Sequence, residues 1–264
     1  GLVSLGAAVF TGRSTIFDSA IEMLGTSDAD ITGNFVDGTG DATTGATQYG
    51  INLVRKSTVP TTSDRNRVLG NSVRQTGSHG IRIAGGSGNI IANNMVANPG
   101  TVAVKAQAIR IEGIASAATN RNLVTKNRCL DDQTATSPSG GVSTNNSISI
   151  TATNTPTANV IEGNILTDGA SAAAVSDSGT TSIVRDNPGY NPQGPATITV
   201  TESPMTYTAG SSPEVVYVQG GTVSGITKAG TILASATGAV IPLEPNEAIV
   251  VTYSAAPTMV RDRK

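Results

Sequence analysis

A short repeated unit constrains the fold of this 264-residue chain more than any other feature. The unit is an aliphatic residue, two variable residues, an Asn, one variable residue and usually another apolar residue. Its copies are Ile31-Thr32-Gly33-Asn34-Phe35-Val36, Val68-Leu69-Gly70-Asn71-Ser72-Val73, Ile91-Ala92-Asn93-Asn94-Met95-Val96, Val124-Thr125-Lys126-Asn127-Arg128-Cys129, Ile161-Glu162-Gly163-Asn164-Ile165-Leu166 and the shorter Val184-Arg185-Asp186-Asn187. Successive Asn residues are 37, 23, 33, 37 and 23 positions apart, so the period varies while the unit does not. Such a pattern is typical of a solenoid, in which each repeat forms one coil.

A second unit, with the pattern apolar-polar-apolar, lies between the copies of the first. Its copies are Ile51-Asn52-Leu53, Ile81-Arg82-Ile83, Ile109-Arg110-Ile111, Ile148-Ser149-Ile150 and the weaker Ala173-Ala174-Val175. A strand this short cannot bury its apolar side alone, but coils stacked about 4.8 Å apart share one core with alternate side chains pointing inward. An Asn at a fixed turn tolerates a left-handed backbone, and its amide can bond to the Asn of the next coil. The two units therefore predict stacked coils with inward Ile and Val rows and a ladder of Asn side chains.

The composition agrees with an all-β chain and argues against several functional classes. The chain has 24 Val and 21 Ile but only 10 Leu, and β-branched side chains pack best on a pleated sheet, which excludes a helical bundle. With 17 Lys+Arg, 19 Asp+Glu, one His and one Cys, the chain fits neither a basic nucleic-acid binder nor a disulfide scaffold nor a zinc finger. No apolar run is long enough for a membrane span. Scarce cysteine with abundant Thr, Ser and Asn predicts an extracellular or virion-surface location.

The chain is expected to contain four segments. These are an N-terminal cap or irregular first coil (1–29), a parallel β-helix of about six coils (30–187), a linker (188–195) and a C-terminal β-domain (196–264). A helix over residues 14–25 is one alternative for the first segment, because Thr15 and Asp18 resemble a capping box. The last segment carries many short strand patterns and is expected to be a small antiparallel sandwich or barrel, with Gly220-Gly221 as the turn of a tight hairpin.

The Asn unit and the Ile-rich unit together resemble right-handed parallel β-helix repeats, the architecture of pectate-lyase-like enzymes and many phage tailspikes. The resemblance covers residues 30–187, and the junction Asn187-Pro188-Gly189-Tyr190-Asn191-Pro192 also resembles the ends of β-helix proteins from phages and bacteria. For a pectate-lyase-like protein, this resemblance implies a substrate groove along a sheet face and an Arg or Lys that removes the proton alpha to a uronate carboxylate. It also implies calcium as the usual lyase cofactor.

The outward positions of the second unit supply the strongest candidate site. Stacking should align Asn52, Arg82, Arg110 and Ser149 in a column, with Arg82 and Arg110 about 5 Å apart and Glu112 on the same face. Two stacked guanidinium groups repel unless an anion lies across them, and they are suited to a carboxylate such as that of a uronate. We therefore assign Arg82, Arg110 and Glu112 as candidate catalytic residues. The alternative is that Glu112 and acidic loop residues neutralise the two arginines on a solvated face.

Other polar residues are weaker candidates for ligand or metal binding. The candidate ligand-binding residues are Asn52, Tyr49, Ser149, Asp131 and Asp132, of which the two aspartates lie in one of the insertions that could wall a groove. A glycosidase needs two carboxylates about 5 Å apart or roughly 6.5–9.5 Å apart, and neighbouring coils carry no such pair, so a hydrolase would need carboxylates from loops or from another subunit. Asp37 and Asp41 resemble a fragment of a calcium loop, with a plain polar loop as the alternative. His79 is expected to end a turn, and Cys129 is expected in the core.

These features lead to three functional hypotheses. The first is a glycan-engaging β-helix of the tailspike or polysaccharide-lyase type that binds or cleaves an acidic polysaccharide. The second is a non-catalytic component of a virion or cell-surface fibre, in which the C-terminal domain caps or trimerises the chain. The third is that the C-terminal domain itself binds the ligand. The sequence is compatible with a homotrimer and leaves open whether the chain is an enzyme, either a lyase or a glycoside hydrolase.

Overall fold

The computed structural model describes residues 4–6, 9–11, 19–38, 48–55, 62–100, 106–114, 117, 119–131, 146–151, 153–168, 174–190 and 195–263. These residues form strands and turns and contain no helix. They divide into two compact units, residues 1–180 with 186–190 and residues 181–185 with 191–264. A linker was expected at residues 188–195. Of these, residues 191–194 lie outside the described part of the chain.

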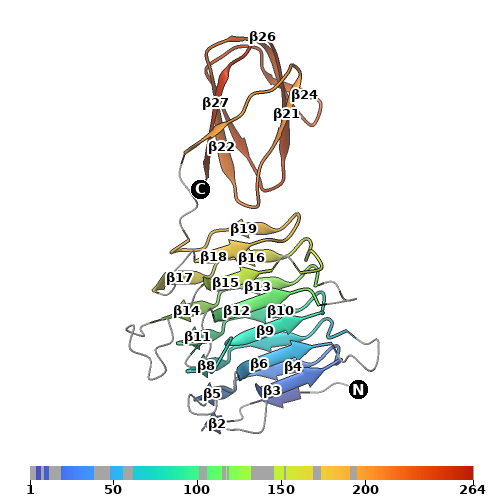
Figure 1. Ribbon diagram of the computed structural model, residues 1–264, viewed down its shortest axis with the longest axis vertical. Coiled ribbons are helices and arrows are strands. Elements are labelled where there is room, and N and C mark those ends of the chain that lie inside the picture. The colour runs from blue at the N-terminus through green and yellow to red at the C-terminus, as the bar shows by residue number, and fades with distance from the viewer. Residues whose placement is uncertain are drawn as a thin grey trace. The chain divides into compact units, whose positions relative to one another are not determined.

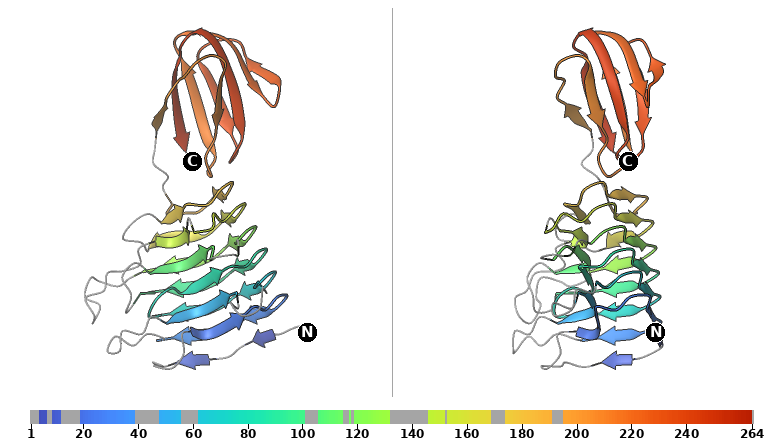
Figure 2. Two further views of the ribbon diagram at one scale, coloured as in Figure 1. Left: turned by 45° about the vertical axis from the view of Figure 1, so that its right-hand side comes forward. Right: turned by 90° about the vertical axis from the view of Figure 1, so that its right-hand side faces the viewer.

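Three parallel sheets form a right-handed parallel β-helix, as predicted (Figure 1). The first sheet contains β1 (Ser4–Gly6), β4 (Asp30–Thr32), β7 (Arg67–Leu69), β10 (Ile90–Ala92), β13 (Leu123–Thr125), β16 (Val160–Glu162) and β19 (Ile183–Arg185). The second contains β2 (Val9–Thr11), β5 (Phe35–Asp37), β8 (Ser72–Arg74), β11 (Met95–Ala97), β14 (Arg128–Leu130) and β17 (Ile165–Asp168). The third contains β3 (Ser19–Leu24), β6 (Tyr49–Val54), β9 (Ile81–Ala84), β12 (Gln107–Glu112), β15 (Asn146–Ile150) and β18 (Val175–Asp177). Each coil adds one strand to each sheet, which the two views of Figure 2 make visible.

Rows of aliphatic side chains fill the interior of the β-helix. The predicted inward positions are fully or almost fully buried, and among them are Ile31, Val68, Ile91, Val124 and Ile161 in one row and Ile51, Ile81, Ile109 and Ile148 in another. The predicted core position of Cys129 is confirmed, since it lies across from Val96 and is 1% exposed. Burial raises the pKa of the Cys129 thiol to about 12, so this side chain behaves as a small apolar residue.

The predicted ladder of Asn side chains is confirmed. In Asn34, Asn71, Asn94, Asn127 and Asn164, the backbone N–H and the side-chain Nδ2 both donate to Oδ1 of the next Asn, up to Asn187, at 2.9–3.0 Å. The Asn residues themselves do not adopt the left-handed backbone that the sequence analysis gave them. That conformation belongs to the preceding residue, for example Gly70 with φ 63° and Lys126 with φ 55°.

A second Asn ladder, which the sequence analysis missed, lies five residues before the first. Its members are Asn66, Asn89, Asn122 and Asn159, and in the first three the N–H and Nδ2 both donate to Oδ1 of the next member at 2.8–3.1 Å. The signal was present in the sequence, because an Asn precedes four of the ladder residues at this fixed spacing. Because these buried amides pair with one another, their burial leaves no polar group of the ladder without a hydrogen-bond partner.

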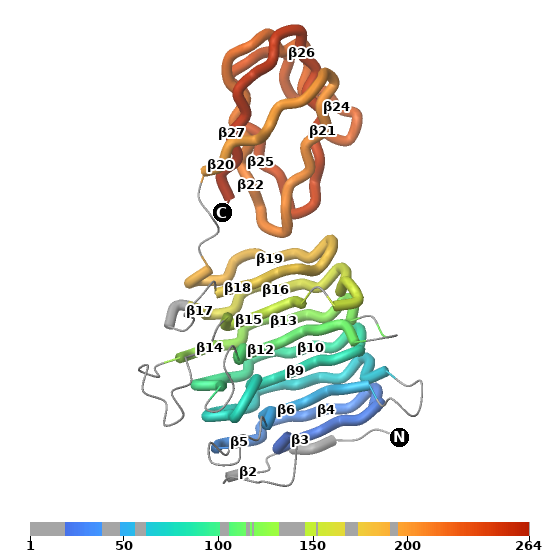
Figure 3. The backbone as a smooth tube through the Cα atoms, in the orientation of Figure 1, coloured from blue at the N-terminus to red at the C-terminus, as the bar shows by residue number. Residues whose placement is uncertain are grey.

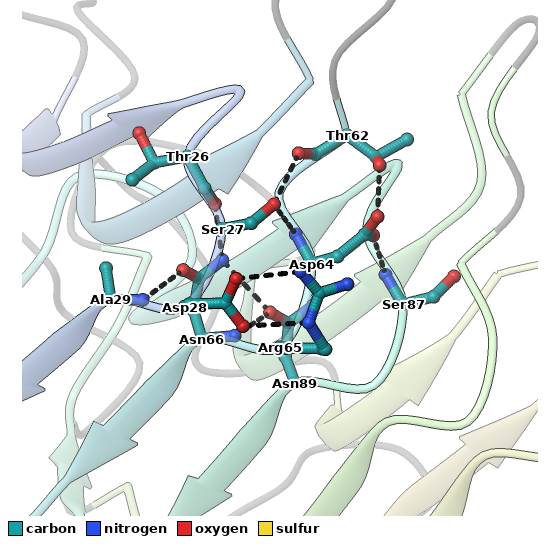
Figure 4. A network of polar contacts seen from close by, with 10 residues as sticks. All are labelled: Thr26, Ser27, Asp28, Ala29, Thr62, Asp64, Arg65, Asn66, Ser87 and Asn89. Atoms are coloured by element: carbon teal, nitrogen blue, oxygen red, sulfur yellow. Dashed lines mark hydrogen bonds and ion pairs between the residues drawn. The ribbon is translucent and has the colours of Figure 1, made fainter. Parts of the chain in front are cut away.

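A third polar row lies two residues before the second ladder, at the turn that enters the first sheet. Figure 4 shows its first members: Asp64 N–H donates to Ser27 Oγ at 3.2 Å, and Ser87 N–H donates to Asp64 Oδ1 at 2.7 Å. The row continues with Asn120 N–H on Ser87 Oγ and Thr157 N–H on Asn120 Oδ1. Side chains of the turns therefore replace the sheet hydrogen bonds where the strands end.

The first coil corrects one expectation. A helix was an alternative over residues 14–25, but residues 19–24 form the strand β3, which pairs in parallel with β6 from Ser19↔Tyr49 to Leu24↔Val54. Long-range pairing with a neighbouring coil outweighs the local capping signal here. Residues 12–18, which include the proposed capping residues, lie outside the described part.

The C-terminal unit is an antiparallel β-sandwich, drawn in orange and red in Figure 3. One sheet contains β20 (Ala196–Ile198), β27 (Thr258–Arg263), β22 (Glu214–Gln219) and β25 (Ala239–Leu243). The other contains β21 (Met205–Thr208), β26 (Ala248–Ala255), β23 (Thr222–Lys228) and β24 (Thr231–Ala234). Gly220 and Gly221 have the positive φ that a tight turn needs, yet they join strands of different sheets, so the expected hairpin is wrong. Apolar side chains from both sheets, such as Val216 and Ile226, form one core.

Candidate functional site

The outer face of the third sheet carries a column of polar side chains. The register aligns Asn52 with Arg82, Arg82 with Arg110 and Arg110 with Ser149, which confirms the predicted column. The same register extends the column to Glu22 on β3 and to Ser176 on β18. These residues face outward because the isoleucines on either side of them occupy the core.

A second outward column lies three residues earlier on each strand. It contains Tyr49, His79, Gln107 and Asn146, with Gln107 aligned on Asn146. Two residues separate the columns, and both of them face the interior. The first of the two is Gly50 or Gly80: a Cβ on Gly50 would lie 2.4 Å from Cγ1 of Val73, and one on Gly80 would lie 2.2 Å from Cγ1 of Val96. Even a Cβ does not fit at Gly50 or Gly80 unless its neighbours shift, and the bend at these positions brings both columns to the same face.

Arg82 is held by partners on two neighbouring strands, β6 and β12. Its Nε donates to Glu112 Oε1 at 2.7 Å, its Nη2 pairs with the same oxygen, and its Nη1 donates to Asn52 Oδ1 at 3.2 Å. Its Cζ atom also lies 4.9 Å from the centre of the Tyr49 ring, which allows a cation–π contact. With only 16% of its side chain exposed, Arg82 has little capacity left for a ligand.

Arg110 is more open than Arg82. Its Nε donates to Glu112 Oε2 at 2.5 Å, and its Nη1 donates to Gln107 Oε1 at 3.3 Å. The same Nη1 lies 3.1 Å from His79 Nε2. The side chain of Arg110 is 29% exposed, against 12% for Glu112.

Glu112 bridges the two arginines and therefore sets the charge of the site. Its two carboxylate oxygens bind different guanidinium groups, which supports the interpretation that this residue neutralises the pair. The cluster of Arg82, Arg110 and Glu112 has one surplus positive charge, and Glu22, at the Arg82 end of the same column, adds a second carboxylate whose Oε1 accepts Asn52 Nδ2 at 3.1 Å. Arg stays protonated in proteins, so a guanidinium group paired with a carboxylate is poorly suited to remove a proton.

His79 belongs to this cluster, although the sequence analysis gave it only the end of a turn. Its ring stacks on Tyr49 with centroids 5.6 Å apart, and its Nδ1 accepts the backbone N–H of Gln107 at 3.0 Å. Burial, together with the nearby charges of Arg110 and Arg82, lowers the pKa of His79 from 6.5 to about 3. The ring is therefore neutral at physiological pH.

The remaining candidates do not join this cluster. Ser149 lies in the column and is buried, whereas Asp131 follows β14 in the second sheet. Asp37 ends β5 directly across from Arg74, a cation that disfavours calcium at this position. Asp132 and Asp41 lie outside the described residues.

The described part of the chain contains neither a cluster of metal-ligating side chains nor a membrane-spanning helix. No group of three or more His, Cys, Asp or Glu side chains in these residues could hold a metal ion. Nor do they contain a helix long and apolar enough to cross a bilayer.

Comparison with known proteins adds one structural likeness. No protein-family model matches the chain, and no curated protein matches it. Among solved structures, the chain is similar to the tailspike gp61 of Pseudomonas phage phi297, with 10% sequence identity and a TM-score of 0.32. The match covers 98% of this chain but 57% of that tailspike. At this level the likeness carries no functional argument, and the fold rests on the three parallel sheets.

Proposed function

We propose that the chain binds an acidic polysaccharide on the outer face of the third sheet. The observation that carries this proposal is the Arg82–Glu112–Arg110 cluster, in which one carboxylate balances only one of two neighbouring cations. The surplus charge lies at Arg110, the more exposed of the two guanidinium groups. A carboxylate of an acidic sugar supplies the missing negative charge, and Arg binds carboxylates with two parallel hydrogen bonds.

The surroundings of the arginines suit the hydroxyl groups of a sugar. Asn52 and Ser149 flank them in the same column, and Gln107 and Asn146 lie in the neighbouring column, each with 3–7% of its surface exposed. Amide and hydroxyl side chains both donate and accept hydrogen bonds, as sugar hydroxyl groups do. The columns run along successive coils, so they offer polar groups at a regular spacing to a polymer.

The proposed activity is binding, without cleavage by these arginines. A lyase needs a base near the sugar, and both guanidinium groups are protonated and paired with Glu112. A hydrolase needs two neighbouring carboxylates, and Glu112 is the one carboxylate that contacts the arginines among the described residues. Arg82, Arg110 and Glu112 are therefore proposed as binding and positioning residues.

The test is a panel of acidic and neutral polysaccharides incubated with the full chain. Binding is measured by retention of the protein on immobilised polymer, while new unsaturated ends and new reducing ends are assayed in the same samples. We expect retention on uronate-containing polymers without new ends of either kind. Equal retention on neutral and acidic polymers contradicts the proposal, and new unsaturated ends contradict its non-catalytic part.

A fibre component is the second candidate, and one observation favours it. Three rows of side-chain hydrogen bonds run along the coils in addition to the sheets, which is suited to a stiff spacer. In this role the C-terminal sandwich would cap the chain, hold it in a homotrimer or carry the ligand site. The molar mass in solution tests the trimer, and the polysaccharide panel repeated with a variant lacking residues 195–264 tests the sandwich as the binding module. Both candidates fit the virion or cell surface as the proposed location.

A further inference from the structure

The position of the proton on His79 follows from its contacts. Nδ1 accepts the backbone N–H of Gln107 at 3.0 Å, so Nδ1 carries no proton. The ring is neutral, because its pKa of about 3 lies far below physiological pH. A neutral imidazole carries one N–H, which must therefore be on Nε2.

This assignment creates a contact between two hydrogen-bond donors. Nε2–H of His79 lies 3.1 Å from Nη1 of Arg110, and a guanidinium group has donors only. Flipping the ring would place a carbon atom against the Gln107 N–H and lose that hydrogen bond. His79 is 7% exposed, and an N–H without an acceptor in such surroundings costs free energy. Arg110 Nη1 has Gln107 Oε1 as an acceptor at 3.3 Å, whereas His79 Nε2–H faces only this donor, and an oxygen placed beside both groups would satisfy it.

We infer that His79 and Arg110 together receive the carboxylate of an acidic sugar, with one oxygen accepting from His79 Nε2–H and the other from the Arg110 guanidinium. This inference rests on the proposed function and deepens it, since it names the residues that recognise the charged group. Arg82 is not a ligand contact in this arrangement. It is a positioning residue, which holds Glu112 and packs on Tyr49, the ring on which His79 stacks.

The charge of the site favours a singly charged ligand group. Glu112 binds both arginines and repels a second negative charge nearby, and Glu22 lies at the Arg82 end of the column, so the local surplus of positive charge is at Arg110. A carboxylate fits this balance, whereas a phosphate monoester carries more charge than the site can offset. A sulfate ester also carries one negative charge, and the experiment separates it from a carboxylate.

The first experiment uses nitrogen NMR of the histidine ring. His79 is the only histidine of the chain, so its ring signals need no assignment. The free protein should show the tautomer with the proton on Nε2. Oligogalacturonate should then shift the Nε2 signal, while its methyl ester, which lacks the charge, should not. A proton on Nδ1, or equal shifts with acid and ester, overturns the inference. A shift with sulfated dextran alone assigns the site to sulfate and overturns the carboxylate assignment.

A matched pair of variants provides the second experiment. The amide oxygen of His79→Asn can take the place of Nδ1 and accept the Gln107 N–H, but this shorter side chain has no donor at the place of Nε2. The amide nitrogen of His79→Gln can reach that place and donate. We expect His79→Asn to weaken oligogalacturonate binding about tenfold or more and His79→Gln to weaken it less than about threefold.

The outcomes distinguish the inference from the function on which it rests. If the unaltered chain binds no acidic polymer, the proposed function fails. If it binds and both His79 variants bind equally well, the function stands and the assignment to His79 is wrong. The unfolding midpoint of each variant shows whether a loss of binding reflects a loss of structure.

Discussion

The β-helix and the C-terminal sandwich bury polar groups in different ways. The β-helix buries neutral amides in rows, and each Asn is satisfied by the same residue of the next coil, as Asn127 is by Asn164. The sandwich buries one carboxylate, that of Glu214, which accepts hydrogen bonds from the Gly210 N–H and from Arg263 Nε at 2.9 Å. Arg261 adds a second cation 3.6 Å away.

The contrast follows from repetition. A buried group that recurs on every coil lies about 5 Å from its copies, so a repeated charge would repel itself while a repeated amide bonds to itself. A position that occurs once can hold a buried charge with its own counter-ions. The exception in the β-helix is the outer face of the third sheet, where Arg82 and Arg110 lie on neighbouring coils and share Glu112. The proposed binding site lies where this general rule is broken.

The largest effect is expected from removing one amide in the interior of the first ladder. Asn127→Ala removes the acceptor of the Asn94 N–H and of one Asn94 Nδ2 hydrogen and the side-chain donor to the Ile91 carbonyl, while Asn164 Oδ1 keeps the backbone N–H of residue 127. Each unpaired buried group costs about 1–3 kcal/mol, so we expect the free energy of unfolding of the β-helix to fall by at least about 3 kcal/mol. Chemical denaturation measures this loss. A loss below about 1 kcal/mol would show that the ladder is incidental to stability.

The matching change in the sandwich is Glu214→Gln, which removes a charge that occurs only once. Removing one partner of a buried ion pair costs about 3–5 kcal/mol, but the two arginines are partly exposed, so we expect a loss of about 2 kcal/mol. Tyr207 reports the change independently, because burial and then its contact with Glu214 raise its pKa to about 12. The pKa of Tyr207, measured by ultraviolet absorbance, should fall in the variant. An unchanged pKa would contradict the role of Glu214.

Acid should weaken the β-helix before it weakens the sandwich. The unfolded chain binds a proton on His79 below about pH 6.5, whereas the folded chain, with a pKa of about 3, does not. The free energy of unfolding therefore falls as pH falls from 6.5 toward 3, by about 1.4 kcal/mol per pH unit, and is unaffected by this group above 6.5. The groups facing His79 are Tyr49, Arg82 and Arg110. His79→Gln should lose this slope, and a wild-type β-helix equally stable at pH 7 and pH 5 would refute the account.

The smallest effect is expected at the exposed ion pairs of the β-helix. Arg65 binds Asp28 through two hydrogen bonds of 2.7 Å, and the side chains are 63% and 56% exposed. Figure 4 shows this pair beside the polar row of the turn. Solvent and salt screen such pairs, so Asp28→Asn should leave the unfolding midpoint almost unchanged. A shift comparable to that of Asn127→Ala would mean that charge, and not amide stacking, holds the coils.

The sequence predicts the regular part of the molecule well because the regularity is local and repeated. The Asn unit predicts the first ladder, and the Ile-rich unit predicts the inward rows and the outward column that contains Arg82 and Arg110. The second ladder was within reach, since Asn66 and its equivalents lie five residues before the first.

The remaining features depend on contacts between distant residues. His79 joins the site only because the backbone bends inward at Gly80, and no local pattern shows that bend. The turn at Gly220-Gly221 is encoded locally, but the pairing of its flanking strands with different sheets is set by the whole sandwich. The pairing of β3 with β6 likewise outweighs the local signal for a helix.

The most direct test of the binding face is a calorimetric titration with oligogalacturonate and with its methyl ester. Three proteins are compared: the unaltered chain, Arg110→Gln, and Arg128→Gln, which makes the same charge change on an exposed residue of the second sheet. We predict that the unaltered chain and Arg128→Gln bind the acid and not the ester, and that Arg110→Gln binds the acid about tenfold more weakly with an unchanged unfolding midpoint. Equal affinity for acid and ester, or equal affinity of the two arginine variants, would contradict the account.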